Sequence, residues 1–454
     1  MTPKNRTIAR RGALKALVIL EREDEMLGSV LSRLDLPAAM RPFAREIATG
    51  VLRHRALLDY TLAPLLKKPL DKLDAPVRAT LRLAAYERIF LNTPAAAVGN
   101  EYAGLMRGEK LSSAVAFVNA VARRLPDHAR AAPDCEREPV AHLAITHSHP
   151  VWLVERWLSR WGFDECAALC AANNQIAPLS LRVNTLRTTR DEVLDALRTR
   201  GLEARLGHLS PDAILVESAG DPTSWPEWQE GLVIAQDEAA QLVARLAAPQ
   251  PGQTVIDVAA APGGKTTHLA QLMQDTGHVI ACDVAPGRLK LVRDNAQRLG
   301  FNSIEVRAGD FREIAPALPP ADAVVLDAPC LGTGTFRRRP DAKWRKTPEQ
   351  LHELMRLQRS LLDAAAQKVR PGGTLVYATC SLEAEENEEQ VRTWLSEQTD
   401  WTIEMPADSL LPEATWQQII TAEGFLQTRP HRHGCDGMFA AKLRRAVSHR
   451  ERTL

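Results

Sequence analysis

From about residue 236 onward, short apolar segments of strand length alternate with segments of helical pattern. Alternation of this kind predicts a parallel, doubly wound α/β sheet with helices on both faces. The expected helices between the strands include 265–273, 288–299 and 348–369. The expected strands are 254–258, 278–282, 303–307, 323–326 and 374–378. Ligands of open α/β sheets bind outside the carboxyl ends of the strands, so the residues after each strand are the first candidates for a functional site.

Acidic residues and thiols follow these predicted strands. A Gly-rich loop follows the first strand, Asp283 the second and Asp310 the third. The fourth strand leads into Asp-Ala-Pro-Cys at 327–330, and the fifth leads into Thr-Cys-Ser at 379–381. One acid at a strand end is usually a helix cap or a turn residue. Capping does not account for three acids and two thiols at successive strand ends, so we predict a ligand site there.

The loop after the first strand is rich in small residues, and it reads Ala259-Ala260-Ala261-Pro262-Gly263-Gly264-Lys265-Thr266. A P-loop requires glycine where this chain has Ala259, and the dinucleotide fingerprint G-x-G-x-x-G is absent. Small residues allow the backbone to approach a ligand closely. Asp283 lies 20 residues after Gly263, the distance at which an acid meets ribose hydroxyls in nucleoside-binding sheets. The pattern predicts a nucleoside ligand that does not need a triphosphate.

Two further domains are predicted upstream of the sheet. Residues 1–130 have the pattern of an all-helical domain with six or seven helices, interrupted by X-Pro pairs that resist helical backbone. A polar, proline-bearing linker follows. Residues 140–235 mix helices with strand-like runs such as 179–183 and predict a small α+β subdomain. The sheet domain is expected to occupy residues 236–445.

Charge is unevenly distributed although the net charge is only +1. Residues 1–134 contain 22 Lys and Arg against 14 Asp and Glu. A basic first third is expected of a domain that binds a polyanion, and equally of a helical domain with a solvated basic face. Seven irregularly spaced cysteines argue against a disulfide framework and against zinc, so no metal is expected. With no apolar run of about 18–20 residues and no secretory signal, we expect a cytoplasmic protein that does not bind membranes.

In combination, these motifs resemble the RNA cytosine-5 methyltransferase family. The resemblance spans about 236–445 and rests on AAAPGGKT, Asp283, Asp310, DAPC and TCS, with GMFAAKL at 437–443 similar to the family's last strand. LRVNTLR at 181–187 and QDEAAQ at 236–241 resemble the accessory subdomain and the entry segment. REIATGVLRHR at 45–55 and AVAFVNAVARRL at 114–125 resemble a NusB-type RNA-binding domain. The combination is similar to the RsmB (Sun, Fmu) type, which methylates cytosine 967 of bacterial 16S ribosomal RNA.

The resemblance implies a Rossmann-like domain that binds S-adenosylmethionine. The implied cofactor-binding residues are Ala259, Ala260, Ala261, Pro262, Gly263, Gly264, Lys265, Asp283, Asp310 and Asp327. Among them, Asp283 is expected to bind the ribose hydroxyls and Asp310 the adenine amine, while Asp327 contacts the target base or the methionine amine. Lys265 either orients Asp327 or meets a phosphate. The family's loop often opens with Cys, where this chain has Ala259, and only a small side chain is needed there.

The resemblance also implies which thiol attacks cytosine. A Pro-Cys dipeptide carries the nucleophile in DNA cytosine methyltransferases, and Pro329-Cys330 matches it. The RNA family attacks instead with the Cys of its Thr-Cys motif and uses the Pro-Cys thiol to help release the product. We therefore expect Cys380 to be the nucleophile, with Cys330 as the release residue and Asp327 as the acid beside the base. Each thiol has the alternative of being inert and buried, since free cysteine packs well in cores.

The expected RNA contacts are basic residues beside the site and in the first domain: Arg337, Arg338, Arg339, Arg10 and Arg11, with Lys343, Arg345, Lys346, Arg6, Arg53 and Arg55 as further candidates. Trp344 is expected to pack rather than to stack on a base. We expect a monomer that binds 16S rRNA, naked or early in assembly, and no DNA. The alternatives are a transfer-RNA cytosine-5 methyltransferase, a nucleotide-hydrolysing enzyme and a non-catalytic RNA-binding or antitermination protein.

Overall fold

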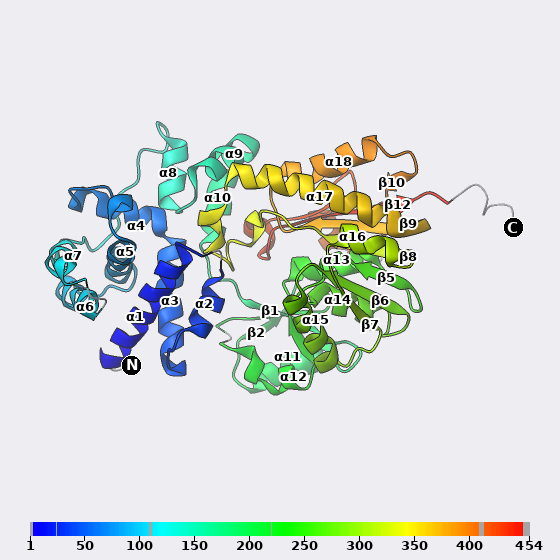
Figure 1. Ribbon diagram of the computed structural model, residues 1–454, viewed down its shortest axis with the longest axis horizontal. Helices are drawn as coiled ribbons and strands as arrows, with labels where there is room; N and C mark the ends of the chain where they lie inside the picture. Colours follow the sequence, from blue (N-terminus) through cyan, green and yellow to red (C-terminus); the bar gives the residue numbers. More distant parts are fainter. Residues whose placement is uncertain (1–2, 24, 109–110, 219, 408–412, 448–454) are drawn as a thin grey trace. The chain divides into compact units, whose positions relative to one another are not determined.

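The computed structural model describes residues 3–23, 25–108, 111–218, 220–407 and 413–447 (Figure 1). The chain divides into two compact units. Unit 1 contains Met1–Gln175 together with Phe336–Lys346, and unit 2 contains Ile176–Thr335 together with Thr347–Leu454. No helix among the described residues combines the length and the apolar character that a bilayer span requires.

Unit 1 is helical. Its first part contains α1 (Pro3–Leu20), α2 (Leu27–Arg33), α3 (Arg41–Arg53), α4 (Arg55–Leu62), α5 (Ala75–Phe90), α6 (Ala95–Gly108) and α7 (Val115–Arg123). These seven α-helices of the described residues match the predicted all-helical first domain. Pro42 and Pro76 lie in the first turns of α3 and α5, where the missing N–H of proline has no helical partner to lose. The proline pairs therefore lie at helix starts, and the residues before them, Arg41 and Ala75, are already part of the helices.

Three more helices belong to unit 1: α8 (Pro139–Thr146), α9 (Val151–Trp161) and α10 (Phe163–Asn173). These helices fall in the region of the predicted subdomain 140–235, together with the strands that follow. The contacts of the chain instead group these helices with unit 1 and those strands with unit 2. The boundaries 1–130, 140–235 and 236–445 remain predictions.

Residues 336–346, which follow the DAPC motif in the sequence, complete the interior of unit 1. Phe336 and Lys343 are fully buried. The Lys343 Nζ donates hydrogen bonds to the Arg53 carbonyl (3.0 Å) and to Asn174 Oδ1 (3.2 Å). Trp344 Nε1 donates to the Leu52 carbonyl at 2.6 Å, so Trp344 packs as predicted. The segment is thus a structural part of the helical unit.

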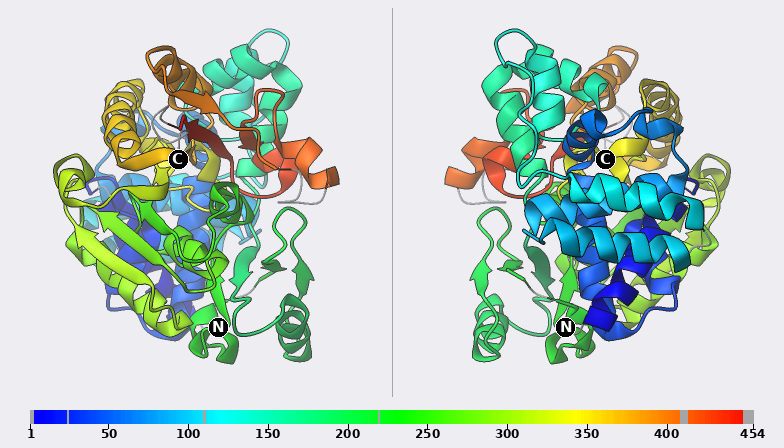
Figure 2. Two further views of the ribbon diagram at one scale, coloured as in Figure 1. Left: turned by 90° about the vertical axis from the view of Figure 1, so that its right-hand side faces the viewer. Right: turned by 90° about the vertical axis from the view of Figure 1, so that its left-hand side faces the viewer.

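Unit 2 begins with a small antiparallel sheet in the order β2-β3-β1-β4 (Figure 2). Its strands are β1 (Leu179–Val183), β2 (Ala204–Leu206), β3 (Ala213–Val216) and β4 (Val233–Ala235), with helices α11 (Arg190–Thr199) and α12 (Pro226–Gln229). A capping box of Thr189 and Glu192 starts α11. Val193 and Leu197 of this helix pack on Leu181 and Ile214 of the sheet, because alternate strand residues point to one face.

The main sheet of unit 2 has eight strands, in the order β10-β12-β9-β8-β5-β6-β7 with β11 beside β12. The strands are β5 (Thr254–Asp257), β6 (His278–Asp283), β7 (Ile304–Ala308), β8 (Ala321–Asp327), β9 (Val369–Thr379), β10 (Trp401–Ile403), β11 (Leu426–Thr428) and β12 (Met438–Arg445). The pairs from β9 through β8, β5 and β6 to β7 are parallel, and β12 is antiparallel to β9. The predicted Rossmann-like sheet is confirmed, with GMFAAKL in its last strand.

Helices cover both faces of this sheet (Figure 1). They include α13 (Glu238–Ala247), α14 (Gly264–Leu272), α15 (Pro286–Leu299), α16 (Phe311–Ile314), α17 (Pro348–Lys368) and α18 (Glu388–Ser396). Val255 of β5 belongs to the core cluster that includes α13 and α14, and its neighbour Ile256 belongs to the cluster that includes α17. In this sheet β5 lies between β6 on one side and β8 on the other, so the strand order reverses at β5. A ligand crevice is therefore expected at the carboxyl end of β5.

Candidate active site

The Gly-rich loop turns sharply from β5 into α14. Gly263 has φ of +102°, and a Cβ atom at this position would lie 3.1 Å from the Cα of Val292. Only glycine adopts this backbone next to so close a neighbour without strain. Ala260 N donates to the Cys282 carbonyl at 2.8 Å, which ties the loop to the end of β6. Small residues therefore bring the loop backbone to the carboxyl edge of the sheet.

A cavity of about 230 Å³ adjoins this loop. Its apolar walls include Val258, Phe311 and Leu361, and its carboxylates are Asp283 and Asp310. Ala259, Pro329, Val284, Arg288, Gly309, Arg312 and Leu357 complete the lining. An apolar slot with acceptors at its edge suits an adenosine, whose ring is flat and whose hydroxyls and amine donate hydrogen bonds. The structure brings together Ala259, Asp283 and Asp310 here, while the other predicted cofactor residues of the loop do not line the cavity.

Asp283 is held in place by backbone donors. It is buried, and its Oδ2 accepts a hydrogen bond from Ala261 N at 3.2 Å while its Oδ1 accepts from Ala285 N at 2.9 Å. Each carboxylate oxygen has more than one acceptor site. Asp283 therefore fixes the loop and keeps acceptor capacity for a ligand in the cavity.

Asp310 caps the short helix α16 and accepts a hydrogen bond from Arg312 N at 3.0 Å. The Arg312 guanidinium also pairs with this carboxylate. That hydrogen bonding holds the pKa of Asp310 below its ordinary value. Asp310 therefore remains a charged acceptor at the cavity.

The two predicted thiols lie side by side at the ends of neighbouring parallel strands. Asp327 of β8 is in register with Ala378 of β9, and Cys330 and Cys380 follow these residues. Their Sγ atoms are 3.5 Å apart, and both side chains are partly exposed. The hydrogen bond with Cys380, together with burial, raises the pKa of the Cys330 thiol well above its ordinary value. The protonated form of Cys330 is therefore favoured beside Cys380.

Lys265 pairs with Asp327, with 2.7 Å between Nζ and Oδ2. Burial opposes the charge of Lys265, but the Asp327 carboxylate outweighs it and raises the pKa of the lysine. Of the two roles considered for Lys265, this ion pair favours the one in which the lysine orients Asp327, which remains a prediction. Lys265 belongs to the Gly-rich loop and Asp327 to the DAPC motif, so the pair joins the two motifs.

Sequence reasoning missed two buried residues of this site. Asp257 ends β5 and accepts a hydrogen bond from Thr266 Oγ1 at 2.7 Å, and burial raises the pKa of Asp257 to about 6. Its strand-end position, which it shares with Asp283 and Asp327, was the available signal. Arg182 of the small sheet is fully buried and donates to the Gly264 carbonyl and to Thr267 Oγ1 in the first turn of α14. Arg182 lies in the LRVNTLR segment at 181–187, but these two partners are 82 and 85 residues away, so no local pattern indicates the contact.

The structure corrects two of the predicted RNA contacts. Arg10 is buried, and its guanidinium pairs with Glu87 at 2.7 Å and with Glu101 at 3.0 Å. Lys343 is buried as described above. Arg10 is paired with carboxylates and Lys343 is hydrogen-bonded inside unit 1, so neither cation is available to a polyanion. Arg11 and Arg339 are exposed, and Arg337 and Arg338 are half-buried in the segment that belongs to unit 1.

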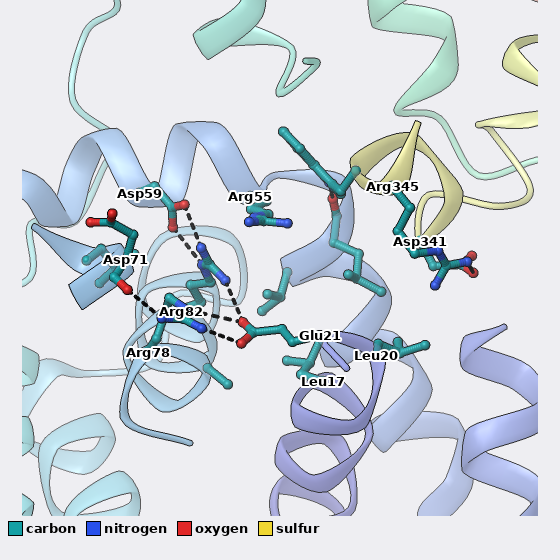
Figure 3. A pocket seen from close by; sticks show the side chains of 15 residues that line it. Leu17, Leu20, Glu21, Arg55, Asp59, Asp71, Arg78, Arg82, Asp341 and Arg345 are labelled. Atoms are coloured by element: carbon teal, nitrogen blue, oxygen red, sulfur yellow. Dashed lines mark hydrogen bonds and ion pairs between the residues drawn. The ribbon is translucent and has the colours of Figure 1, made fainter. Parts of the chain in front are cut away.

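Unit 1 also contains a cavity of about 470 Å³ (Figure 3). Two of its arginines, Arg78 and Arg82, are neutralised by Glu21 and Asp59. A third, Arg55, lies with its guanidinium 5.1 Å from the centre of the Trp344 ring. Among the described residues, no carboxylate pairs with Arg55, and burial lowers the pKa of this arginine. Arg55 thus makes no ion pair among the described residues, although the carboxylates of Asp59 and Glu21 favour its charged form.

No group of three or more His, Cys, Asp and Glu side chains that could hold a metal occurs in the part of the chain that the structure describes. All seven cysteines lie in that part, and each is a free thiol.

Models of three protein families match the chain. A family model for the 16S rRNA methyltransferase RsmB/F matches residues 244–444. Models for the ferredoxin-like domain of RsmF/B-like methyltransferases and for the NusB family match 149–223 and 7–127. A probable ribosomal RNA small subunit methyltransferase B of Bacillus subtilis is 34% identical over 97% of this chain and 99% of its own length. The ribosomal RNA small subunit methyltransferase B of Pseudomonas syringae pv. tomato is 37% identical, with 96% of each chain covered.

Solved structures agree with this fold. The crystal structure of PH0851 matches with a TM-score of 0.82 and 27% identity, over 98% of this chain and 99% of that one. A methyltransferase homologue from Pyrococcus horikoshii matches with a TM-score of 0.58 and 29% identity, over 68% of this chain and 99% of that one.

The cavity beside the Gly-rich loop fits the adenosine part of S-adenosylmethionine, the methyl donor of this class of enzyme. Asp283 and Asp310 supply carboxylate acceptors, and Val258 and Leu361 supply apolar walls. The matches cover nearly the whole length of this chain and of its relatives. The chain therefore belongs to the RsmB/F family of 16S rRNA methyltransferases and is an S-adenosylmethionine-dependent enzyme.

Proposed function

We propose that this enzyme methylates carbon 5 of a cytosine in 16S ribosomal RNA through a covalent adduct with Cys380. The observation that supports the proposal is the meeting of two thiols and one carboxylate at the ends of β8 and β9, with 3.5 Å between the two sulfur atoms. A nucleotide-hydrolysing enzyme has no use for two adjacent thiols. The alternative of a non-catalytic RNA-binding protein is not supported either, since every predicted catalytic side chain is present.

The chemistry begins on the cytosine ring. The Cys380 thiolate forms a bond to carbon 6, and the electron pair of the 5,6 double bond becomes available at carbon 5. Asp327 holds the pyrimidine edge near ring nitrogen 3 and the exocyclic amine. When bound, S-adenosylmethionine supplies the electrophilic methyl group.

Release reverses the addition. Carbon 5 loses its proton to a base, the double bond forms again and the bond between carbon 6 and Cys380 breaks, which returns the thiolate. Cys330, which keeps its proton, assists this release by donating to the departing Cys380 sulfur. The target cytosine must be single-stranded or flipped out of its stack, because the ring faces are otherwise covered.

Two variants test the assignment of the thiols. Cys380→Ala should abolish methylation and any covalent RNA adduct. Cys330→Ala should still attack the base and should accumulate the adduct, which denaturing gel electrophoresis detects as a protein band shifted by RNA. If instead Cys330→Ala abolishes the adduct and Cys380→Ala accumulates it, the assignment is reversed.

The proposed substrate is cytosine 967 of 16S rRNA, naked or early in assembly, and the enzyme acts as a cytoplasmic monomer. The names of relatives, ribosomal RNA small subunit methyltransferase B, support the choice of small-subunit ribosomal RNA. The domain 1–130 would then bind RNA. The subdomain 140–235 would support the site, and the domain 236–445 would catalyse the reaction. Bisulfite sequencing of ribosomal and transfer RNA from a deletion strain tests the substrate. Loss of 5-methylcytosine from transfer RNA alone would favour the transfer-RNA alternative.

Phosphate contacts are proposed for Arg337, Arg338, Arg339 and Arg11, and for Arg55 at the cavity of unit 1. These residues are at least partly accessible, unlike Arg10 and Lys343. Guanidinium groups bind phosphate oxygens with paired hydrogen bonds. The contacts would hold the RNA backbone while the target base reacts.

A further inference from the structure

Two consecutive residues, Glu386 and Asn387, lie behind the two thiols. Glu386 ends a short 3-10 turn, and Asn387 precedes α18. Both side chains are buried, with 0% and 4% exposure. Both residues follow the TCS motif closely, and no local sequence pattern marks either of them.

Glu386 brackets Cys330, which means that it is hydrogen-bonded, directly or through Gln358, to the peptide groups on both sides of Cys330. Its Oε1 accepts a hydrogen bond from the N–H of Leu331 at 3.0 Å and another from Gln358 Nε2 at 2.8 Å. The same Gln358 Nε2 donates to the Pro329 carbonyl at 2.8 Å. The peptide groups on both sides of Cys330 are therefore held by one pair of buried side chains. Burial raises the pKa of Glu386, against the hydrogen bonds that lower it.

Asn387 brackets Cys380 in the same way. Its Oδ1 accepts a hydrogen bond from Thr379 Oγ1 at 2.5 Å, and its Nδ2 donates to the Ser381 carbonyl at 2.9 Å. Thr379 and Ser381 are the neighbours of Cys380 in the chain, and both are buried. A direct backbone bond from Gly334 N to the Cys380 carbonyl, 3.0 Å long, joins the two loops as well.

We propose that Glu386 and Asn387 are positioning residues that hold the Cys330 and Cys380 loops in register and thereby set the distance between the two sulfur atoms. Because the two residues are adjacent in the chain, a shift of one loop is resisted by the other. The consequence for catalysis rests on the proposed function: Glu386 supports release by Cys330, and Asn387 supports attack by Cys380. Misplacement by about 1 Å costs roughly 100-fold in rate at such sites.

The first experiment does not depend on methylation. Each thiol is alkylated with iodoacetamide across a range of pH in the enzyme without RNA, and mass spectrometry of the two peptides gives an apparent pKa for each. In the enzyme without substitutions, the apparent pKa of Cys330 should lie above that of an ordinary thiol, because Cys330 shares a hydrogen bond with Cys380. In Asn387→Leu, which changes no charge, the apparent pKa of Cys330 should fall by about one unit or more. An unchanged titration would overturn the proposal.

Glu386 is tested with a pair of variants. Glu386→Gln removes the charge but keeps an acceptor for Leu331 N, whereas Glu386→Leu removes both. If the hydrogen bond matters, Glu386→Leu should shift the Cys330 titration clearly more than Glu386→Gln does, and equal shifts in both would count against a positioning role. Glu389→Leu, at an exposed position of α18, is the matched control. Thr379→Val, which removes one hydrogen bond of the Asn387 bracket, replaces Asn387→Leu if the latter does not fold.

The second experiment uses RNA. Glu386→Leu should lower turnover roughly 10- to 100-fold and raise the fraction of enzyme trapped as adduct, whereas Asn387→Leu should lower adduct formation itself by a similar factor. General destabilisation would lower both quantities together in both variants, which would contradict the inference. If the thiol titrations shift but the Cys380→Ala and Cys330→Ala variants do not behave as described above, the positioning role stands and the proposed function fails.

Discussion

At the scale of single residues, the most unusual group is the amine of Lys343, which is buried in unit 1 among helix carbonyls and an amide. Burial lowers the pKa of Lys343 to about 7. The same lysine has a pKa of about 10.4 in an unfolded chain. Between these two values the unfolded chain binds a proton that the folded chain does not, so the free energy of unfolding rises with pH there. The contribution is lost as pH falls toward 7.

We therefore predict that unit 1 becomes more stable between pH 7 and pH 9 by about 2 kcal/mol from this group alone. Urea unfolding curves at the two pH values measure the difference. In Lys343→Met the increase should disappear, whatever the absolute stability of the variant. Lys67→Met, at an exposed position, should keep the increase, and a parent enzyme whose stability does not respond to pH would contradict the role of Lys343.

A second residue-scale prediction concerns Asp283, which joins the Gly-rich loop to the cofactor cavity. Asp283→Ala removes the acceptor for Ala261 N and the acceptor for a ligand hydroxyl together. Affinity for S-adenosylmethionine, measured by isothermal titration calorimetry, should fall roughly 10- to 100-fold, since hydrogen bonds to charged groups contribute about 1.5–3 kcal/mol each. Unchanged affinity would show that the nucleoside binds elsewhere.

At the scale of elements, the turn from β5 into α14 offers a matched pair of glycines. An alanine at position 263 would have to adopt a left-handed backbone, and its Cβ atom would lie only 3.1 Å from the Cα of Val292. A Cβ atom on Gly264 would meet only the Gln236 side chain, at 3.5 Å. Gly263→Ala should therefore destabilise unit 2 by about 1–2 kcal/mol or more, whereas Gly264→Ala should be nearly neutral. Thermal unfolding of the two variants checks this, and equal effects would refute the geometry.

The strands and helices of the main sheet were largely predictable from the sequence. Apolar runs of strand length, bounded by residues such as Gly263 and Asp283, placed β5, β6 and β7 within a residue or two of where they lie. The strand-end rule then placed the acids and thiols at one edge of the sheet. Functional residues whose positions depend on local sequence pattern and on sheet topology can therefore be predicted from the sequence.

Contacts between distant segments were not predictable in this way. Arg10 belongs to a basic first third, and only its partner Glu87, 77 residues away, shows that its charge is neutralised inside the helical unit. Asn387 and Glu386 look like ordinary polar residues at the start of a helix. Their function as brackets appears only when the loops of two strands come together.

At the scale of the whole molecule, the excess positive charge of residues 1–134 is only partly available to RNA. Arg10, Arg78 and Arg82 pair with carboxylates, whereas Arg11 is exposed and Arg55 has no carboxylate partner among the described residues. Electrostatic binding to RNA depends on the accessible cations, because each phosphate contact releases counterions.

We predict that Arg55→Met raises the dissociation constant for 16S rRNA fragments and reduces the dependence of log affinity on log salt by about one unit. Filter binding at several salt concentrations measures both quantities. Arg10→Met should instead lower the stability of unit 1 by about 3–5 kcal/mol, as expected when one partner of a buried ion pair is removed, and should leave the salt dependence unaltered. A change of the salt dependence in Arg10→Met would reverse this division of roles.

Phe336 and Lys343 complete the interior of a unit whose other residues end at Gln175. During translation, helices α1 to α10 leave the ribosome first, and the segment 336–346 is complete only 171 residues after Gln175. At roughly 5–20 residues per second, this delay lasts about 10 to 30 s. Throughout that interval Trp344 and Lys343 are not yet available to bind the Leu52 and Arg53 carbonyls. The helical unit can therefore mature only after three quarters of the polypeptide has been synthesised.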